Sequence, residues 1–149
     1  MSVPLAFAAM SGDAREQINI PQDALQAMYD HSFACFPEEM CGLIVGRHDT
    51  NTVVRFVPTT NVAHSARVYT IDPKEHMRAD MAAEDEGLEI IGCVHSHTHS
   101  QAYPSPTDVA AAPDPAWHYV IVSLETGQAA ARSYRIVGEE ITETSISAL

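Results

Sequence analysis

LEIIGCVHSHTHSQAYPSPTD, residues 88–108, is the stretch of sequence that decides the fold. Its first part, LEIIGCVH (88–95), is an apolar run with the length of a buried strand. Two prolines then mark a loop, and Ser105 followed by Pro106 is typical of a helix start, so we expect a short helix at about 106–112. The stretch therefore predicts a strand, a loop and a helix in direct succession, which indicates a domain that mixes both kinds of element.

The rest of the chain extends this pattern in both directions. Pro21 opens a helix that has apolar side chains at helical spacing and should end before Pro37. A second helix, 73–87, has a proline at its start, a glycine at its end and good helix formers between them. Strand-like runs cover QINIP (17–21), 41–46, 52–58, 67–72, 117–124, 130–137 and 139–146, of which 41–46 and 52–58 should form a hairpin. The sequence thus predicts an α+β fold with a single mixed, mostly antiparallel sheet flanked by helices.

The length of 149 residues suits a single domain. We assign residues 1–16 to a weakly ordered N-terminal leader and residues 17–149 to the domain. The leader lacks the basic region of a signal peptide and its apolar stretch is short. No run approaches the roughly 20 apolar residues that cross a bilayer. We therefore expect a cytoplasmic protein.

Charge and cysteine content restrict the partners. Twenty acidic residues against eight Lys plus Arg give a formal net charge of -12. Such a surface repels phosphate backbones and anionic lipid, so we expect neither nucleic acid nor membrane as a partner. Cys35, Cys41 and Cys93 are odd in number and are interpreted as reduced thiols, the last two as packing residues of buried strands. The oligomeric state stays open, and a homo-oligomer is compatible with the sequence.

Two histidines at the end of the predicted strand 88–95 indicate a metal site. His95 and His97 stand two residues apart, so their side chains leave the strand on the same side and can form half of a tetrahedral zinc site. Asp108, at the start of the short helix, would add a carboxylate and leave the fourth position open, as in catalytic zinc sites. Two alternatives remain at this point: the pair could be ordinary surface histidines, and His99 could be the third ligand.

The spacing of these residues resembles a peptidase signature. His-Ser-His, a serine ten residues after the first histidine and an aspartate three residues further on, with Pro104 before the serine, resemble the JAMM (MPN+) metallopeptidase family. The family also has a glutamate in a Pro-x-Glu stretch before a buried strand, and PEEMCGLIVG (37–46) places Glu39 rather than Glu38 in that position. The order of elements from about 18 to 146 is similar too. The resemblance implies an MPN/JAB1-like fold, which is similar to that of cytidine deaminase.

The resemblance also implies a role for each residue of the motif. His95, His97 and Asp108 would hold Zn²⁺, while Glu39 would act as general base and then as general acid. Ser105 would donate a hydrogen bond to the oxyanion that develops on the scissile carbonyl. The simpler alternatives are a solvated carboxylate at a helix end for Glu39 and a helix cap for Ser105.

Two further histidines receive other interpretations. His99 is assigned to the loop or to substrate contact, because Asp108 fills the third ligand position in the resemblance. His118 lies in an apolar strand and is interpreted as a histidine of the core or of a sheet edge.

Thr98 follows the second histidine, where the commonest form of the family has proline. HSHT followed by AYPS and TDV is similar to a small bacterial branch, the CysO–cysteine peptidases, which remove amino acids or short adducts from ubiquitin-like sulfur carriers. The resemblance implies a carrier with a C-terminal Gly-Gly tail as partner and cysteine or a short adduct as the released group. Thr98 leaves the metal ligands in place and affects the loop that shapes substrate fit. The alternatives are a deubiquitinase-like isopeptidase, a non-catalytic MPN scaffold and a His-rich metal-binding module.

Overall fold

The order of elements agrees closely with the expectation. The structure, a computed structural model, describes residues 16–149 of the chain. Within these residues the elements are β2 (Gln17–Ile20), α1 (Gln22–Cys35), β3 (Cys41–Arg47), β4 (Thr52–Thr59), α2 (Pro73–Asp85), β5 (Glu89–His97), α3 (Pro106–Ala111), β6 (His118–Ser123), β7 (Ala130–Val137) and β8 (Glu140–Ala148). The predicted α+β class is confirmed.

The helix boundaries follow from local chemistry. α1 begins directly after Pro21, whose missing N–H costs nothing at a helix start, and ends before Pro37. At the start of α2 the Asp72 carboxylate accepts a hydrogen bond from the Lys74 amide at 2.8 Å and so satisfies one of the free N–H groups of the first turn. The three predicted helices are therefore confirmed to within two residues at their ends.

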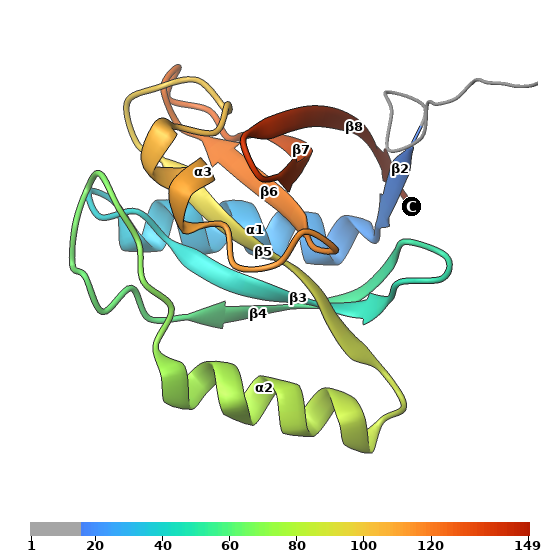
Figure 1. Cartoon of the computed structure of the whole chain (residues 1–149). Helices are drawn as coiled ribbons and strands as arrows, with labels where there is room; N and C mark the ends of the chain where they lie inside the picture. The colour runs from blue at the N-terminus through green and yellow to red at the C-terminus, as the bar shows by residue number, and fades with distance from the viewer. Residues whose placement is uncertain (1–15) are drawn as a thin grey trace, which may run out of the picture.

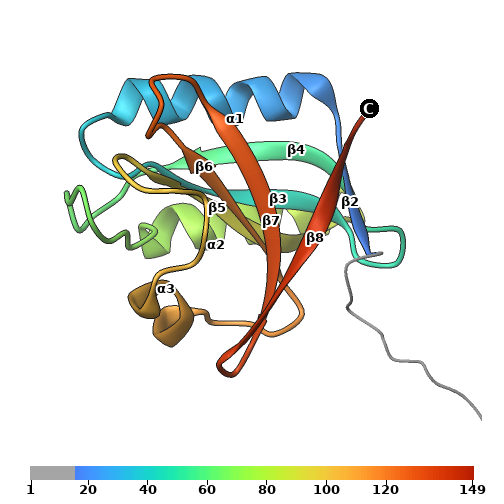
Figure 2. The ribbon, with the colours of Figure 1, turned by 90° about the horizontal axis from the view of Figure 1, so that it is seen from above.

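The sheet is mixed and closes on itself. Its strand order is β2-β4-β3-β5-β6-β7-β8, with antiparallel pairs β3–β4, β3–β5, β6–β7 and β7–β8 and a parallel pair β5–β6. β2 closes the barrel, because it pairs in parallel with β8 along its whole length and meets β4 at a single pair, Asn19 with Thr52. Figures 1 and 2 show β2 beside β8 and the end of β4. The single mixed sheet was predicted, but its closure was not.

One predicted strand, 67–72, is wrong. This segment belongs to a loop, in which Ile71 forms an isolated bridge with Asn61. The Asn61 carboxamide explains the difference, since its Oδ1 accepts hydrogen bonds from the amides of Ala63 and Thr70, both at 3.0 Å. Its Nδ2 donates to the Val68 carbonyl, also at 3.0 Å. The Asn61 side chain thus forms hydrogen bonds with backbone groups of this segment that would otherwise pair with an adjacent strand.

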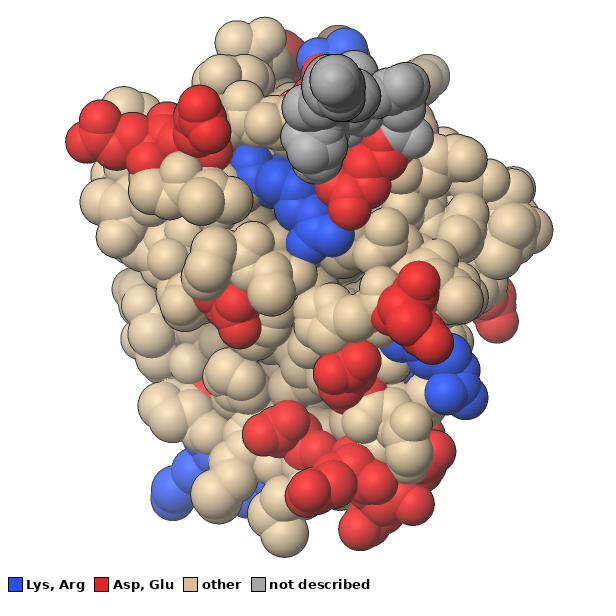
Figure 3. Space-filling view, turned by 45° about the vertical axis from the view of Figure 1, so that its right-hand side comes forward, with Lys and Arg blue, Asp and Glu red and all other residues tan. Residues whose placement is uncertain are grey.

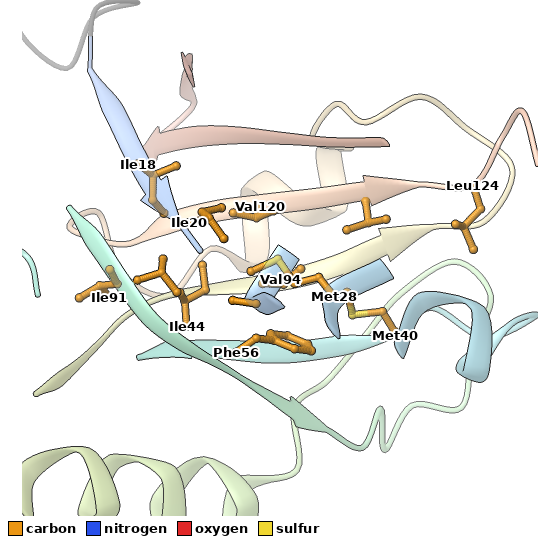
Figure 4. Packing of buried hydrophobic residues seen from close by; sticks show 13 residues of the cluster. Ile18, Ile20, Met28, Met40, Ile44, Phe56, Ile91, Val94, Val120 and Leu124 are labelled. Atoms are coloured by element: carbon orange, nitrogen blue, oxygen red, sulfur yellow. The ribbon is translucent and has the colours of Figure 1, made fainter. Parts of the chain in front are cut away.

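Helices cover both faces of the sheet (Figure 1). On one face α1 buries Met28 against Met40 and Phe56, and Figure 4 shows these side chains together with those of β2, β5 and β6. On the other face α2 buries Ala79 and Ala83 against β3, β5 and β6, and α3 contributes to the edge of the same cluster. Neighbouring side chains of β3 go to opposite faces, Leu43 and Val45 to one and Ile44 to the other, and β5 also contributes to both clusters with an irregularity in its pairing with β3.

The sheet register brings three chain segments to one edge. β5, α3 and β6 form a crossover unit, and the carboxyl ends of its two parallel strands lie together, where ligand sites of such sheets are found. β3 runs antiparallel to β5, with Cys41 paired to His95, so the residues just before β3 reach the same edge. Gly92 allows β5 and β6 to approach, because a Cβ there would lie 2.1 Å from the carbonyl oxygen of His118.

The described part of the chain begins at Glu16. Its carboxylate accepts hydrogen bonds from Nε and Nη2 of Arg135 at 3.1 and 2.6 Å, so this residue is bound to the folded domain. The rest of the predicted leader lies outside the described residues.

Figure 3 shows acidic side chains gathered at the lower end of the molecule, over α2. No helix of the described part is long and apolar enough to cross a membrane.

The three cysteines are free thiols, as expected. Burial raises the pKa of Cys41 to about 11, although a hydrogen-bonding contact with Thr59 opposes the shift, and burial raises the pKa of Cys93 to about 12. Both thiols therefore stay protonated near neutral pH and pack as small apolar groups.

Candidate metal centre and active site

Two strand residues and one helix residue converge at the carboxyl end of β5. His95 and His97 leave β5 on the same side, and Asp108 reaches them from the first turn of α3. The two Nε2 atoms lie 3.2 Å apart, and Oδ2 of Asp108 lies 3.1 Å from that of His95 and 3.0 Å from that of His97. All three side chains are buried. The structure thus brings together the three residues that the sequence offered as metal ligands.

The start of α3 fixes the orientation of the Asp108 carboxylate. Ser105 Oγ accepts a hydrogen bond from the Asp108 amide at 3.0 Å, and Asp108 Oδ2 accepts one from the Ser105 amide at 2.9 Å. This reciprocal pair is a capping box, which satisfies two free N–H groups of the helix start. The same contacts leave Asp108 pointing at the histidines.

The dimensions of this cluster fit a tetrahedral zinc ion. With zinc-to-ligand distances of about 2.0–2.1 Å, neighbouring ligand atoms of a tetrahedral site lie about 3.3–3.4 Å apart. The three atoms here are separated by 3.0 to 3.2 Å. A modest expansion of the cluster would therefore accommodate the ion.

The hydrogen bonding of His97 gives a second reason to expect a metal ion at this cluster. Its Nδ1 lies 2.8 Å from the Gln101 carbonyl oxygen, so Nδ1 carries the proton and the neutral ring presents a lone pair at Nε2. That lone pair faces Asp108 Oδ2, which is also an acceptor. Two acceptors in contact require a cation or a proton between them, so the donor set suits a divalent metal.

The electrostatics of the cluster are those of a carboxylate beside imidazoles. Burial opposes ionisation of Asp108, yet the adjacent imidazoles of His95 and His97 hold its pKa well below the usual range. Burial lowers the pKa of His95, and Asp108 only partly offsets this. Burial acts in the same direction on His97, but Asp108 and the Gln101 carbonyl outweigh it and raise its pKa. Asp108 is therefore negatively charged in this cluster.

Glu39 lies at the same edge, in the turn before β3. It is 4% exposed, and its Oε1 has no hydrogen-bond partner among the described residues. Burial raises the pKa of Glu39 to about 8, His97 lowers it and Asp108 raises it. Of the two glutamates of PEEM, Glu39 is thus the buried one, whereas Glu38 contacts the exposed ring of His64 at 3.5 Å.

A cleft of about 520 Å³ joins these groups. It is lined by Glu39, Ala66, Arg67, His97, Thr98, His99, Ser100 and Ser105. His99 is exposed on its rim, with its Nδ1 2.9 Å from Thr98 Oγ1 and its ring 5.8 Å from that of Phe36. His118 lies elsewhere, buried with Nε2 3.0 Å from Asn51 Oδ1, as expected for a core histidine.

The structure adds two residues that sequence reasoning missed. Tyr69 stacks on the His95 ring with centroids 4.4 Å apart and limits the positions that this ring can take. Asn61 donates from Nδ2 to the Glu39 carbonyl at 3.0 Å. Both come from the loop that was predicted to contain a strand, and nothing in their local sequence distinguishes them from ordinary strand or turn residues.

The fold and the site together define a class of protein. It is a mixed α+β domain in which two histidines and an aspartate converge beside a buried glutamate. The family model described as prokaryotic homologs of the JAB domain matches residues 21–137. This match covers most of the chain, and the chain belongs to that family. The resemblance to the JAMM (MPN+) family is thereby confirmed.

Several relatives are similar over most of their length. The CysO-cysteine peptidase of Mycobacterium tuberculosis is 36% identical over 129 residues, which is 86% of this chain and 88% of the relative. The desampylase of Haloferax volcanii is 37% identical over 74% of this chain and 78% of its own. The probable TtuB-protein conjugate cleaving protease of Thermus thermophilus is 32% identical over 72% and 75%.

Solved structures agree with the fold. A protein from Desulfitobacterium hafniense superimposes with a TM-score of 0.81 at 30% identity, over 89% of this chain and 92% of that one. A JAB1/MPN domain protein from Archaeoglobus fulgidus gives a TM-score of 0.62 at 15% identity, over 89% and 98%. The MPN/JAB1-like fold is therefore confirmed.

Proposed function

We propose that this chain is a zinc-dependent peptidase that hydrolyses the amide bond after the C-terminal glycine of a ubiquitin-like sulfur carrier. The released group is cysteine or a short adduct. The observation that carries the proposal is the convergence of His95, His97 and Asp108, with ligand atoms 3.0 to 3.2 Å apart, beside a cleft that is lined by His97 and the buried Glu39. The name of the mycobacterial relative supports the substrate class.

Each residue has a task in this reaction. Zinc held by His95, His97 and Asp108 would act as a Lewis acid and activate water at neutral pH. Glu39 accepts a proton from the attacking water and then delivers it to the leaving amine. Burial suits it to both steps, because a carboxyl whose pKa is raised to about 8 exchanges a proton readily near neutral pH.

Ser105 serves as the hydrogen-bond donor to the oxyanion. Its Oγ is the acceptor in the capping box with Asp108, so the hydroxyl hydrogen remains free to point into the cleft that Ser105 lines. The helix-cap role and the oxyanion role are therefore compatible, since one uses the oxygen lone pair and the other uses the proton.

The test is a pair of neighbouring variants assayed with the CysO–cysteine conjugate. Glu39→Gln should keep bound zinc, measured by elemental analysis, and lose hydrolysis by about 10²–10⁴-fold. Glu38→Gln makes the same replacement at the partly exposed neighbour and should retain activity. A fully active Glu39→Gln protein would overturn the assignment.

A second candidate activity is hydrolysis of isopeptide conjugates between a ubiquitin-like modifier and a protein. The name of the Thermus thermophilus relative favours it. Assays on a lysine-linked conjugate and on the carrier–cysteine conjugate distinguish the two activities. A scaffold would show neither zinc nor turnover, and a metal-binding module would show zinc without turnover.

A further inference from the structure

One arginine lines the cleft at the proposed active site. Arg67 shares this cleft with Glu39, His97 and Ser105. Three other arginines are neutralised by ion pairs, Arg55 with Glu86, Arg132 with Glu143 and Arg135 with Glu16. Arg67 makes no such pair with another described residue. Among the described residues Arg47 and Arg78 also lack an ion pair, but only Arg67 lies in the cleft, where its exposed guanidinium can meet a ligand.

The loop that carries Arg67 is held in place from both sides. The Arg67 amide donates to Ser65 Oγ at 3.0 Å, and the Ser65 carbonyl accepts from the Glu39 amide at 2.8 Å. On the other side Thr98 Oγ1 donates to the Ala66 carbonyl at 3.4 Å. Thr98 directly follows His97, so the backbone on which Arg67 sits is bonded both to the proposed base and to the strand that carries the metal ligands. This fixed backbone reduces the conformational freedom that binding would otherwise remove.

The chemistry of the proposed substrate supplies a matching group. An amino acid joined through its α-amino group to the carrier carries a free carboxylate one carbon away from the scissile nitrogen. A lysine side chain joined to the carrier has no charge at that place. A guanidinium binds a carboxylate with two parallel hydrogen bonds and compensates its charge, so Arg67 is the side chain of this cleft best suited to such a group.

We propose that Arg67 forms a subsite for the α-carboxylate of the amino acid that is released. This inference rests on the proposed function and makes it narrower. The enzyme distinguishes a carrier bearing a single amino acid from a carrier linked to a protein lysine, because only the former places a carboxylate at Arg67. Arg67 is then a specificity residue, and Thr98 and Ser65 are positioning residues that act through its loop.

The experiment compares the CysO–cysteine conjugate with the same conjugate ending in cysteine amide, using the full zinc-loaded protein. We expect the wild-type protein to prefer the free acid by about 10–100-fold in kcat/KM, the range for hydrogen bonds to a charged group. Arg67→Gln should reduce this preference to about one, because it should slow hydrolysis of the free acid much more than hydrolysis of the amide. Arg67→Lys should restore part of it. Arg78→Gln, which removes an exposed arginine of α2, should behave as wild type.

Two outcomes would overturn the subsite. If Arg67→Gln slows both substrates equally, Arg67 binds the carrier tail instead of the carboxylate. If it slows neither, Arg67 does not contact the substrate.

A binding measurement separates this inference from the proposed function. L-cysteine and cysteamine share the thiol and the amine and differ in the carboxylate. In the NMR spectrum, the Nε–H signal of Arg67 is identified by its absence from the spectrum of Arg67→Gln. This signal should shift when L-cysteine is added and stay unchanged when cysteamine is added. If neither conjugate is hydrolysed, the proposed function fails while this titration still decides the subsite, and equal shifts with both compounds would contradict it.

Discussion

Asn61 Nδ2 donates a hydrogen bond to the carbonyl oxygen of Glu39 at 3.0 Å and so joins the loop after β4 to the residue before β3. The same carboxamide binds four further backbone groups of its own loop, those of Ala63, Ser65, Val68 and Thr70. A single buried side chain therefore organises the loop and the position of Glu39 at once.

Replacement of Asn61 by alanine should destabilise the protein and slow catalysis. Several backbone groups of a buried loop would lose their partner, which costs about 2–3 kcal/mol in the free energy of unfolding. Urea denaturation measures the loss. Val62→Ala, at an exposed position of the same loop, should change stability by less than about 0.5 kcal/mol. An Asn61→Ala protein as stable as wild type would show that the loop does not depend on this residue.

The stability of the protein should decrease in mild acid because of His118. Burial, together with the positive charge of Arg135, lowers the pKa of His118 to about 4. The unfolded chain takes up the proton near its usual pKa of about 6.5, so the folded state loses stability as the pH falls from about 6.5 to 4. Between pH 7 and pH 5 the loss from this group is about 2 kcal/mol.

The comparison with His118→Gln isolates this contribution. Glutamine can still donate to Asn51 Oδ1 but does not titrate. Urea unfolding of both proteins at pH 7 and pH 5 should give a smaller decrease for the variant. Equal decreases in the two proteins would mean that other groups account for the acid sensitivity.

Two replacements of Ser105 separate its cap role from its proposed oxyanion role. Ser105→Ala should cost about 1 kcal/mol of stability through the lost helix cap, whereas Ser105→Gly should cost only a few tenths. Both remove the hydroxyl, so both should reduce kcat by about 10²–10³-fold. If the loss of kcat in the two variants instead parallels their loss of stability, so that Ser105→Gly is nearly as active as wild type, Ser105 acts only as the cap of α3.

Zinc should stabilise the folded state through Asp108. At a free zinc concentration of 100 times the dissociation constant the gain in unfolding free energy is about 2.7 kcal/mol. Asp108→Asn can still accept from the Ser105 amide but lacks the charge, so the gain at the same zinc concentration should largely disappear. His99→Ala should keep the gain in unfolding free energy that zinc produces. The opposite result, with the gain lost in His99→Ala and kept in Asp108→Asn, would make His99 the third ligand.

The sequence by itself determined the elements and the chemistry available at one edge of the sheet. The apolar run 88–95 marked β5, the prolines at 21, 73 and 106 marked the helix starts, and the two-residue period of a strand placed His95 and His97 on one side. These features depend on near neighbours in the chain, and local sequence therefore predicts them. The matched motif spacing identified the family.

Only the tertiary structure decided how distant segments meet. Glu39 comes close to His97 because β3 pairs with β5 in a register that no local pattern specifies. β2 closes the sheet through backbone pairing with β8, which lies more than a hundred residues away. The segment 67–72 alternates like a strand, yet the Asn61 carboxamide binds part of its backbone and turns it into the loop that places Arg67 in the cleft. Strand alternation describes one segment, whereas hydrogen-bond partners depend on which segments fold together.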